Sequence, residues 1–190
     1  MARTSNKSSK SAAEEAPARK PIPWGGIITG VTVVGAIAAL VLFDPPPPGV
    51  EFPSQGNFHL ASVDEPHAEY NSSPPSSGPH VGLLANWGVH EEPVPAELFI
   101  HNMEDGGIVI TYDCPDGCEE LKAGLTSLVE DVGGRVVLTP YEGIEHEGVQ
   151  YRAAVAAWTR VFFFDELTET NESEVRTFIR LYEGIDHHAR

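Results

Sequence analysis

Two cysteines stand close together in a chain that contains no others. Cys114 and Cys118 lie in the segment YDCPDGCEEL, which connects a β-branched apolar run to an amphipathic stretch. We therefore expect both sulfurs at the start of a helix, where backbone N–H groups and the helix dipole stabilise thiolates. In an oxidising compartment such a pair has three interpretations: a short disulfide, a dithiol redox couple, or two soft ligands for a thiophilic metal such as Cu(I). The spacing alone does not choose among them.

Imidazole and carboxylate groups form the second set of candidate ligands. All eight histidines follow residue 58, at His59, His67, His80, His90, His101, His146, His187 and His188. The run HNMED at residues 101–105 places one of them beside two carboxylates. Because imidazole and carboxylate both bind transition metals, we expect a metal cluster. Its expected members are His80, His101, Glu104, Asp105 and one of His187 and His188.

The histidine cluster and the cysteine pair are expected to be separate sites. We expect His101 to open a strand that runs through Gly107–Tyr112 and leads to Cys114. Six strand residues separate their ends by about 20 Å. One strand therefore cannot bring His101 and Cys114 together.

Each candidate also has a simpler structural interpretation. His80 and His101 could be ordinary surface or capping histidines, and His187 and His188 lie near a chain end, where side chains are often merely exposed. Core packing is the simpler role for Met103. A structural disulfide is the simplest state of the two cysteines, because exported cysteine pairs usually oxidise.

The excess of acidic residues limits the kinds of partner that the protein can bind. The chain has 190 residues, with 12 Lys and Arg against 28 Asp and Glu, and a formal net charge of −16. Phosphate neutralisation needs a basic surface, so a nucleic-acid partner is not expected. Partners should be neutral, basic or metallic. The length allows one domain of ordinary size, and two cysteines are too few for a disulfide-built miniprotein.

An uncharged apolar run near the N-terminus predicts a transmembrane helix. Trp24–Phe43 contains 20 residues without a charge, enough for a helix to span about 30 Å of hydrocarbon. Five basic and two acidic residues precede this run, whereas seven basic and 26 acidic residues follow it. This asymmetry predicts a cytoplasmic N-terminus and a domain outside the cell membrane. A cleaved signal peptide is the alternative, and it exports the domain as well.

Composition divides the chain into four parts. The composition of residues 1–23 predicts a disordered cytoplasmic tail, and residues 24–43 form the predicted membrane anchor. Residues 44–57 predict a proline-stiffened spacer, and residues 58–190 an extracytoplasmic domain. Within this domain, frequent Pro, Gly, Ser and Asn over residues 59–95 predict turns and extended segments rather than helices.

The later part of the domain has a readable order of elements. We expect strands over Gly107–Tyr112, Arg135–Pro140 and Tyr151–Phe164, the last as one long or two short strands. Helices are expected over Glu119–Val132 and Glu172–Tyr182. The order β-α-β-β-α predicts an α+β fold, a small sheet with helices on one face, preceded by the Pro/Gly-rich irregular region and the transmembrane helix.

The common enzyme motifs are missing from the sequence. It contains no G-x-S-x-G of a serine hydrolase and no phosphate-binding glycine loop. The HNMED run lacks the second histidine of the H-E-x-x-H zinc-peptidase motif and precedes a Gly-Gly break. A catalyst is therefore the less favoured class of protein.

Four stretches of the domain resemble a known family. They are SSPPSSGPH at 72–80, Trp87-Gly88-Val89, EPVPAEL at 92–98 and IHNMEDGGIVITY at 100–112. This set resembles the exported family of domains of unknown function numbered 3105, over roughly residues 67–188. The chain has His90 where tyrosine is common, and Asp105 where many members have a second histidine. The resemblance implies an exported location and no established activity.

The cysteine segment resembles a second family over a short length. The ten residues YDCPDGCEEL are similar to the C-P-D-x-C-P motif of Sco-type copper chaperones, which are also tethered by one helix. This resemblance implies a copper site at Cys114 and Cys118 that a distant histidine completes.

Together these features predict a membrane-anchored, extracytoplasmic protein that binds a transition metal, with copper favoured and zinc as the alternative ion. The expected role is a carrier or accessory factor that passes its metal to a partner by ligand exchange. Two other classes stay open. One is a non-catalytic anchored subunit or interaction domain of a membrane complex with a structural disulfide, and the other is a thiol oxidoreductase.

Overall fold

The structure is a computed structural model that describes residues 46–188. No helix among these residues has the length and apolar character needed to cross a membrane. The predicted tail over residues 1–23 and the predicted transmembrane helix over residues 24–43 lie outside the described residues.

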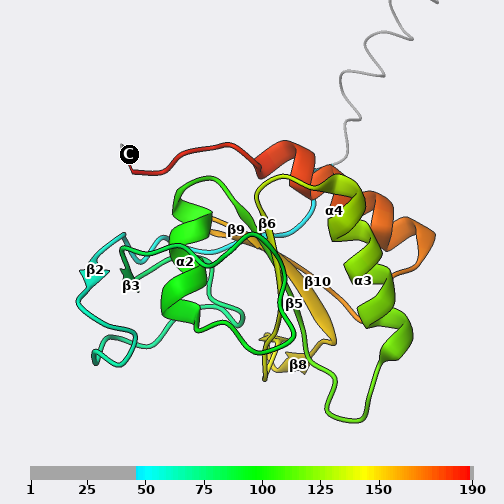
Figure 1. Ribbon diagram of the computed structural model, residues 1–190, viewed down its shortest axis with the longest axis horizontal. Helices are drawn as coiled ribbons and strands as arrows, with labels where there is room; N and C mark the ends of the chain where they lie inside the picture. The colour runs from blue at the N-terminus through cyan, green and yellow to red at the C-terminus, as the bar shows by residue number, and fades with distance from the viewer. Residues whose placement is uncertain (1–45, 189–190) are drawn as a thin grey trace, which may run out of the picture. The chain divides into compact units, whose positions relative to one another are not determined.

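A six-stranded mixed sheet forms the centre of the domain (Figure 1). In sheet order its strands are β1 (Val50–Glu51), β10 (Arg160–Phe164), β9 (Ala153–Ala157), β5 (Ile108–Tyr112), β6 (Val136–Pro140) and β4 (Gly88–Val89). Strands β4, β5 and β6 pair in parallel, whereas β9 pairs antiparallel with both β5 and β10. The predicted α+β class is confirmed, and the segment predicted as one or two strands over residues 151–164 forms two.

Strand β5 lies in the middle of the sheet with all five of its residues buried. Its sequence IVITY is apolar and β-branched because both faces of the strand are covered. Ile108 and Ile110 face one core cluster, and Val109 faces the other, as the alternation of a strand requires. The strand predicted over Gly107–Tyr112 is confirmed.

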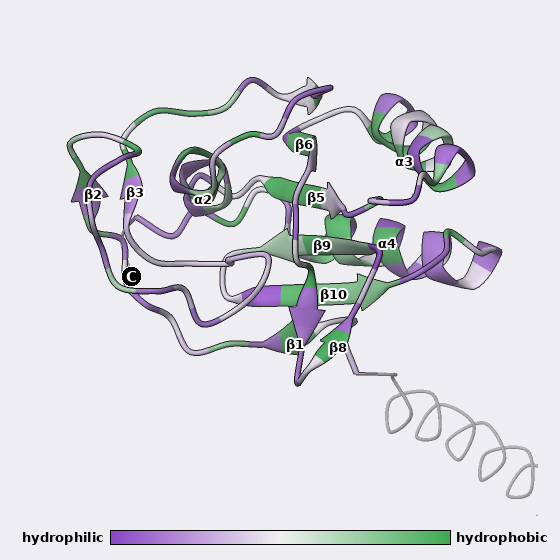
Figure 2. Ribbon diagram, turned by 90° about the horizontal axis from the view of Figure 1, so that it is seen from below, coloured by the Kyte–Doolittle hydropathy of each residue, from purple (hydrophilic) through white to green (hydrophobic). Residues whose placement is uncertain are grey.

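Helices cover both faces of the sheet (Figure 2). Helices α3 (Glu119–Val132) and α4 (Glu169–Tyr182) pack on one face, and α2 (Ala96–Glu104) packs on the other. The two predicted helices are confirmed, the second beginning slightly earlier than Glu172. Because α2 was not expected, the prediction that helices lie on one face alone is wrong.

Helix α2 owes its conformation to burial against the sheet. Phe99, Ile100 and Met103 are fully buried and belong to the core cluster on this face. A helix of only nine residues is marginal by itself, so tertiary packing stabilises it. The thioether of Met103 therefore fills the core, as its simpler interpretation expected.

Helices α3 and α4 follow from clearer local signals. Leu121, Leu125 and Leu128 recur on one helical face of α3, and all three are buried. At the start of α4 the side chain of Thr168 accepts a hydrogen bond from the backbone N–H of Asn171, which caps the helix.

Short strands organise the region before α2 and the connection after β6. Strand β2 (His59–Leu60) pairs in parallel with β3 (His80–Val81), and β7 (Glu145–His146) pairs antiparallel with β8 (Val149–Gln150). The described chain forms no helix over residues 59–95, as the composition predicted. Strand β3 lies against α2, so this irregular region reaches the helix surface (Figure 1).

The folded domain begins before the predicted boundary at residue 58. Val50 in β1 pairs with Val161 in β10, and Phe52 packs against the core cluster on the α2 side. Part of the segment 44–57 is therefore an edge strand of the sheet and not the free spacer that its prolines predicted.

Candidate metal centre

The end of α2 supplies three polar side chains to one region of the domain. His101 and Glu104 are three positions apart, so they lie on the same side of the helix, and Asp105 is its C-cap. The expectation that His101 opens a strand is wrong, because the chain turns at Gly106 before β5 begins. The helix thus presents an imidazole and a carboxylate side by side.

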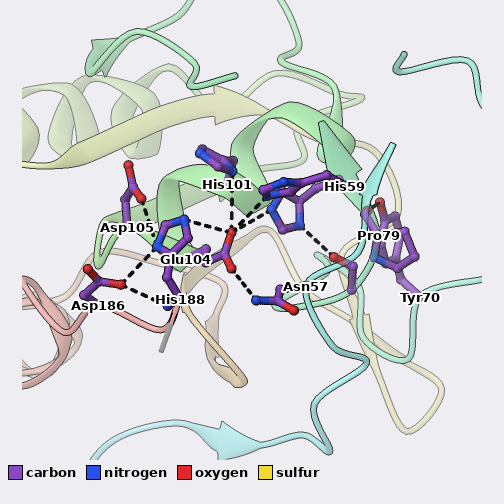
Figure 3. A network of polar contacts seen from close by, with 11 residues as sticks. Asn57, His59, Tyr70, Pro79, His101, Glu104, Asp105, Asp186 and His188 are labelled. Atoms are coloured by element: carbon purple, nitrogen blue, oxygen red, sulfur yellow. Dashed lines mark hydrogen bonds and ion pairs between the residues drawn. The ribbon is translucent and has the colours of Figure 1, made fainter. Parts of the chain in front are cut away.

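Glu104 lies at the centre of four imidazole rings (Figure 3). Its side chain is 0% exposed, and its Oε2 atom faces all four rings. The distances from Oε2 are 3.5 Å to His59 Nε2, 2.9 Å to His80 Nε2, 3.5 Å to His101 Nδ1 and 3.4 Å to His188 Nε2. The other oxygen, Oε1, accepts a hydrogen bond of 2.8 Å from Asn57 Nδ2. One carboxylate therefore gathers side chains from distant parts of the chain.

The His80 ring is held in a fixed orientation from behind. It is fully buried, and its Nδ1 lies 2.8 Å from the backbone oxygen of Gly78. Because a carbonyl oxygen can only accept, this contact places a proton on Nδ1. Nε2 donates to Glu104 Oε2 at 2.9 Å, and on release of that proton its lone pair would face a bound metal ion. Metal-binding histidines typically have this arrangement, with the second nitrogen donating to a carbonyl.

His59 enters the cluster through strand pairing. It is opposite His80 in the register of β2 and β3, and the two ring centroids are 4.8 Å apart. Its side chain is 48% exposed, so this side of the cluster faces solvent. The predicted ligand set left His59 out, because no local signal in the sequence shows that these two short strands pair.

His101 contributes a buried atom that lacks a hydrogen-bond partner. Among residues 46–188, its Nδ1 is the one buried side-chain nitrogen or oxygen in this condition. Burial lowers the pKa of His101, and the His80 ring lowers it further against the opposing effect of Asp105 and Glu104. An unpaired buried polar atom is costly, and a bound cation would give it a partner.

Glu104 keeps its negative charge in this buried position. Burial on its own would raise the pKa of Glu104, but hydrogen bonds from Asn57 and His80 outweigh it, and the pKa is lowered. A buried carboxylate needs a compensating positive charge. The cluster therefore favours a cation when its imidazoles are neutral.

The spacing of these atoms fits a small transition-metal ion. Nitrogen and oxygen ligands about 2.0–2.1 Å from a tetrahedral zinc ion lie about 3.3 Å from one another. The separations of 3.5 Å between Glu104 Oε2 and the rings of His59 and His101 are close to this value, and the 2.9 Å separation to His80 is shorter. The ligand atoms of His59, His80, His101 and Glu104 lie within 4.8 Å of one another. This cluster could hold a metal ion.

A second group of candidate ligands borders the first. It consists of His101, Asp105 and His188, whose ligand atoms also lie within 4.8 Å of one another. His188 Nδ1 is 3.4 Å from Asp105 Oδ1 and 3.0 Å from Asp186 Oδ1. The hydrogen bond with Asp186 raises the pKa of His188.

The C-terminal segment is fastened to the end of α2 by backbone hydrogen bonds. The N–H of Gly184 donates to the oxygen of Gly106 at 2.7 Å, and that of His187 donates to the oxygen of Glu104 at 2.9 Å. The His187 ring stacks on Trp158 with centroids 5.8 Å apart. Of the two predicted C-terminal histidines, His188 thus faces the cluster and His187 packs beside it.

Comparison with known families agrees with the motifs of the sequence. The family model described as Protein of unknown function (DUF3105) matches residues 62–189, more than half of the 190 residues. The chain belongs to this family. No curated protein and no solved structure matches the chain significantly. Because the DUF3105 description states no activity, the function has to be inferred from the site.

The DUF3105 match covers most of the candidate metal centre. His80, His101, Glu104 and His188 all lie inside the matched residues, whereas His59 lies just before them. The exposed ligand is therefore supplied by a segment outside the matched range.

The cysteines of this DUF3105 member form a separate feature. Cys114 and Cys118 are joined in a disulfide and pack against the core beneath α3 and α4, on the face opposite α2. Neither belongs to a candidate metal group among the described residues. A disulfide contains no thiolate, so in this structure the predicted sulfur ligands and the Sco-like site are not formed. Of the three interpretations of the pair, the structure contains the disulfide.

Proposed function

We propose that this protein is a membrane-anchored, extracytoplasmic binding protein for a divalent transition metal, and that it acts as a carrier or accessory factor. The main support is the convergence of His59, His80 and His101 on the buried carboxylate of Glu104. Burying a carboxylate among rings is costly unless a positive charge compensates it. A metal ion supplies that charge and uses the lone pairs of the rings.

The donor set favours Cu²⁺ or Zn²⁺ over Cu⁺. Imidazole nitrogen suits copper and zinc, whereas the soft sulfur ligands that select Cu⁺ are absent from the cluster as described. Cu²⁺ generally binds such sites more strongly than Zn²⁺ does. Copper is therefore the proposed ion, and zinc is its main competitor.

The unequal exposure of the ligands supports a carrier role. Glu104 and His80 are fully buried, whereas nearly half of the His59 side chain is exposed. The buried ligands would hold the ion, and the exposed imidazole could be replaced by a ligand from a partner protein. The proposed location outside the membrane is supported by the apolar run over residues 24–43 and the charge asymmetry around it.

Metal analysis of the purified full-length protein tests this function. We expect a tightly bound Cu²⁺ whose electron paramagnetic resonance spectrum shows coupling to nitrogen, and loss of this ion in His80→Ala. His146→Ala is the matched control, because His146 lies outside both candidate groups. The proposed function is wrong if the protein binds neither Cu²⁺ nor Zn²⁺ above background, or if His80→Ala binds copper like the unaltered protein.

A second candidate function is an anchored subunit of a membrane complex. Phe58 and Leu83 are large apolar side chains with exposures of 66% and 70%. Docking on a partner would remove these two side chains from water, and the Cys114–Cys118 disulfide suits a structural role. Co-purification with a membrane complex at fixed stoichiometry, unchanged in His80→Ala, would favour this function over metal transport.

A further inference from the structure

We propose that His101, Asp105 and His188 form a second cation position, through which an ion is loaded into the cluster around Glu104 and released from it. We refer to this group as the outer position and to the cluster of His59, His80, His101 and Glu104 as the inner position. The inference rests on the proposed function, because it describes how the same ion would reach and leave its site.

On the side of the cluster away from His59, exposure to solvent rises step by step from Glu104 to His188. The exposed fraction of the side chain is 0% for Glu104, 12% for His101, 31% for Asp105 and 41% for His188. An ion that arrives from solvent on this side therefore meets the outer ligands before Glu104. The exposed Asp186 adds a further carboxylate at this rim, 3.0 Å from His188 Nδ1.

The His188 ring lies between the carboxylates of the two positions (Figure 3). Its Nε2 is 3.4 Å from Glu104 Oε2, and its Nδ1 is 3.4 Å from Asp105 Oδ1. A neutral imidazole has a single lone pair. His188 can therefore bind an ion at the outer position through Nδ1 or at the inner position through Nε2, but not at both at once.

His101 is shared between the two groups. Its Nδ1 faces Glu104, and its ring centroid is 5.7 Å from that of His188. An ion that moves between the positions can thus exchange one ligand at a time and keep a contact with the protein throughout. Transfer through shared ligands avoids returning the ion to water between the two positions.

Local contacts hold the outer ligands in place. The backbone N–H of His188 donates to Asp186 Oδ1 at 2.9 Å, and the neighbouring backbone is hydrogen-bonded to the end of α2. The guanidinium of Arg135 donates to the backbone oxygen of Asp105 at 2.7 Å and not to its side chain. The Asp105 carboxylate therefore stays available to a cation.

The kinetics of copper exchange separate the outer position from the inner one. Metal-free full-length protein is mixed with Cu²⁺, and uptake and chelator-driven release are followed by stopped-flow absorbance. We expect Asp105→Asn to slow uptake and release by about tenfold, a larger change than its change in equilibrium affinity. Glu130→Gln removes the same charge from the exposed surface of α3, on the opposite face of the sheet, and should exchange copper at the unaltered rate.

A second variant changes the outer position without altering Asp105, the sequence neighbour of Glu104. His188→Gln removes an imidazole that faces both positions, so it should slow uptake and release and also lower the affinity. If both variants exchange copper as fast as the unaltered protein, or lose affinity without slower exchange, the outer position is wrong and the proposed function stands. If the unaltered protein takes up neither Cu²⁺ nor Zn²⁺, the proposed function fails and the outer position fails with it.

Discussion

Glu104 is the residue on which the candidate metal centre depends. Its carboxylate is completely buried, and its charge is maintained by hydrogen bonds from Asn57 and His80. The imidazoles are arranged around an anion that water does not reach. Changes at this residue should therefore act on metal binding more than on the fold.

The substitution Glu104→Gln tests this role of the buried charge. The amide keeps the shape of the side chain and can still contact Asn57 and His80. We expect the affinity for Cu²⁺ to fall by about 100-fold or more, since even outer-shell partners of a metal are worth about 10–100-fold. Glu97→Gln on the same helix, which alters the pair with His67, is the control. Calorimetric titrations that give equal affinities for the two variants would contradict the prediction.

The burial of His101 predicts how the stability of the metal-free protein depends on pH. Burial lowers the pKa of His101 in the folded chain, whereas the unfolded chain keeps the ordinary value of 6.5. Below that value the unfolded chain binds a proton that the folded chain does not, so the free energy of unfolding falls as the pH falls. Denaturant titrations between about pH 7 and pH 5.5 should show this loss.

The variant His101→Asn isolates the contribution of this one ring. The rings of His59, His80 and His188 face His101 and are retained in the variant. We therefore expect a smaller loss of stability over the same pH range. An identical pH dependence in the two proteins would show that the burial of His101 has no such effect.

At the scale of elements, the end of α2 joins the helix, the turn into β5 and the C-terminal segment. Gly106 has a φ of +79°, and a Cβ atom there would lie 2.7 Å from the backbone nitrogen of Ile185. Glycine therefore satisfies both the turn and the close approach of the segment that carries His188. The proposed outer position depends on this contact between the end of α2 and the C-terminal segment.

Gly106→Ala should lower the free energy of unfolding by more than the positive φ alone would. Gly143 has a nearly identical φ of +78° but open space around its missing Cβ, so Gly143→Ala is a matched control. In both variants the positive φ is strained for alanine and lowers the free energy of unfolding. Only Gly106→Ala adds overpacking, which lowers it by about 1–3 kcal/mol more. Chemical denaturation should reveal this difference, and equal stabilities of the two variants would show that the segment can move aside freely.

At the scale of the whole molecule, the sheet separates the candidate metal centre from the disulfide. The candidate metal centre lies at α2 on one face, and the disulfide lies at the start of α3 on the other. Each face of the sheet has its own core cluster, and neither cysteine belongs to a candidate metal group. Stability and metal binding should therefore respond separately to changes in the two features.

The double substitution Cys114→Ser and Cys118→Ser tests this separation. Loss of a disulfide that closes so short a loop should lower the free energy of unfolding by about 2 kcal/mol. The affinity for Cu²⁺ should not change, because the sulfurs are not ligands of the inner position. A large loss of copper affinity would instead support the Sco-like site that the sequence segment resembles.

Metal binding should also stabilise the whole domain. An ion that binds the folded chain alone raises the free energy of unfolding by about 2.7 kcal/mol when its concentration is 100 times the Kd. Thermal unfolding should therefore shift to higher temperature with Cu²⁺ and return when a chelator is added. His80→Ala should show no such shift, and a shift of the same size in that variant would indicate copper binding elsewhere.

Elements with strong local patterns were predictable without coordinates. The β-branched run of β5 predicted a strand, and the leucine spacing of α3 predicted a helix, because the period of buried residues follows from strand and helix geometry. The imidazole and carboxylate groups at residues 101–105 also pointed to the part of the chain around which the structure gathers further histidines. The family followed from motifs, which are local as well.

The membership of the candidate metal centre depended on contacts between distant segments. Helix α2 forms because Phe99 and Ile100 are buried against the sheet, and its nine residues carry too weak a local signal by themselves. His59 meets Glu104 through the pairing of two-residue strands, whose register no local pattern specifies. Which side chains share one buried carboxylate was therefore decided by tertiary packing, because burial and strand register are properties of the folded chain and not of any short segment.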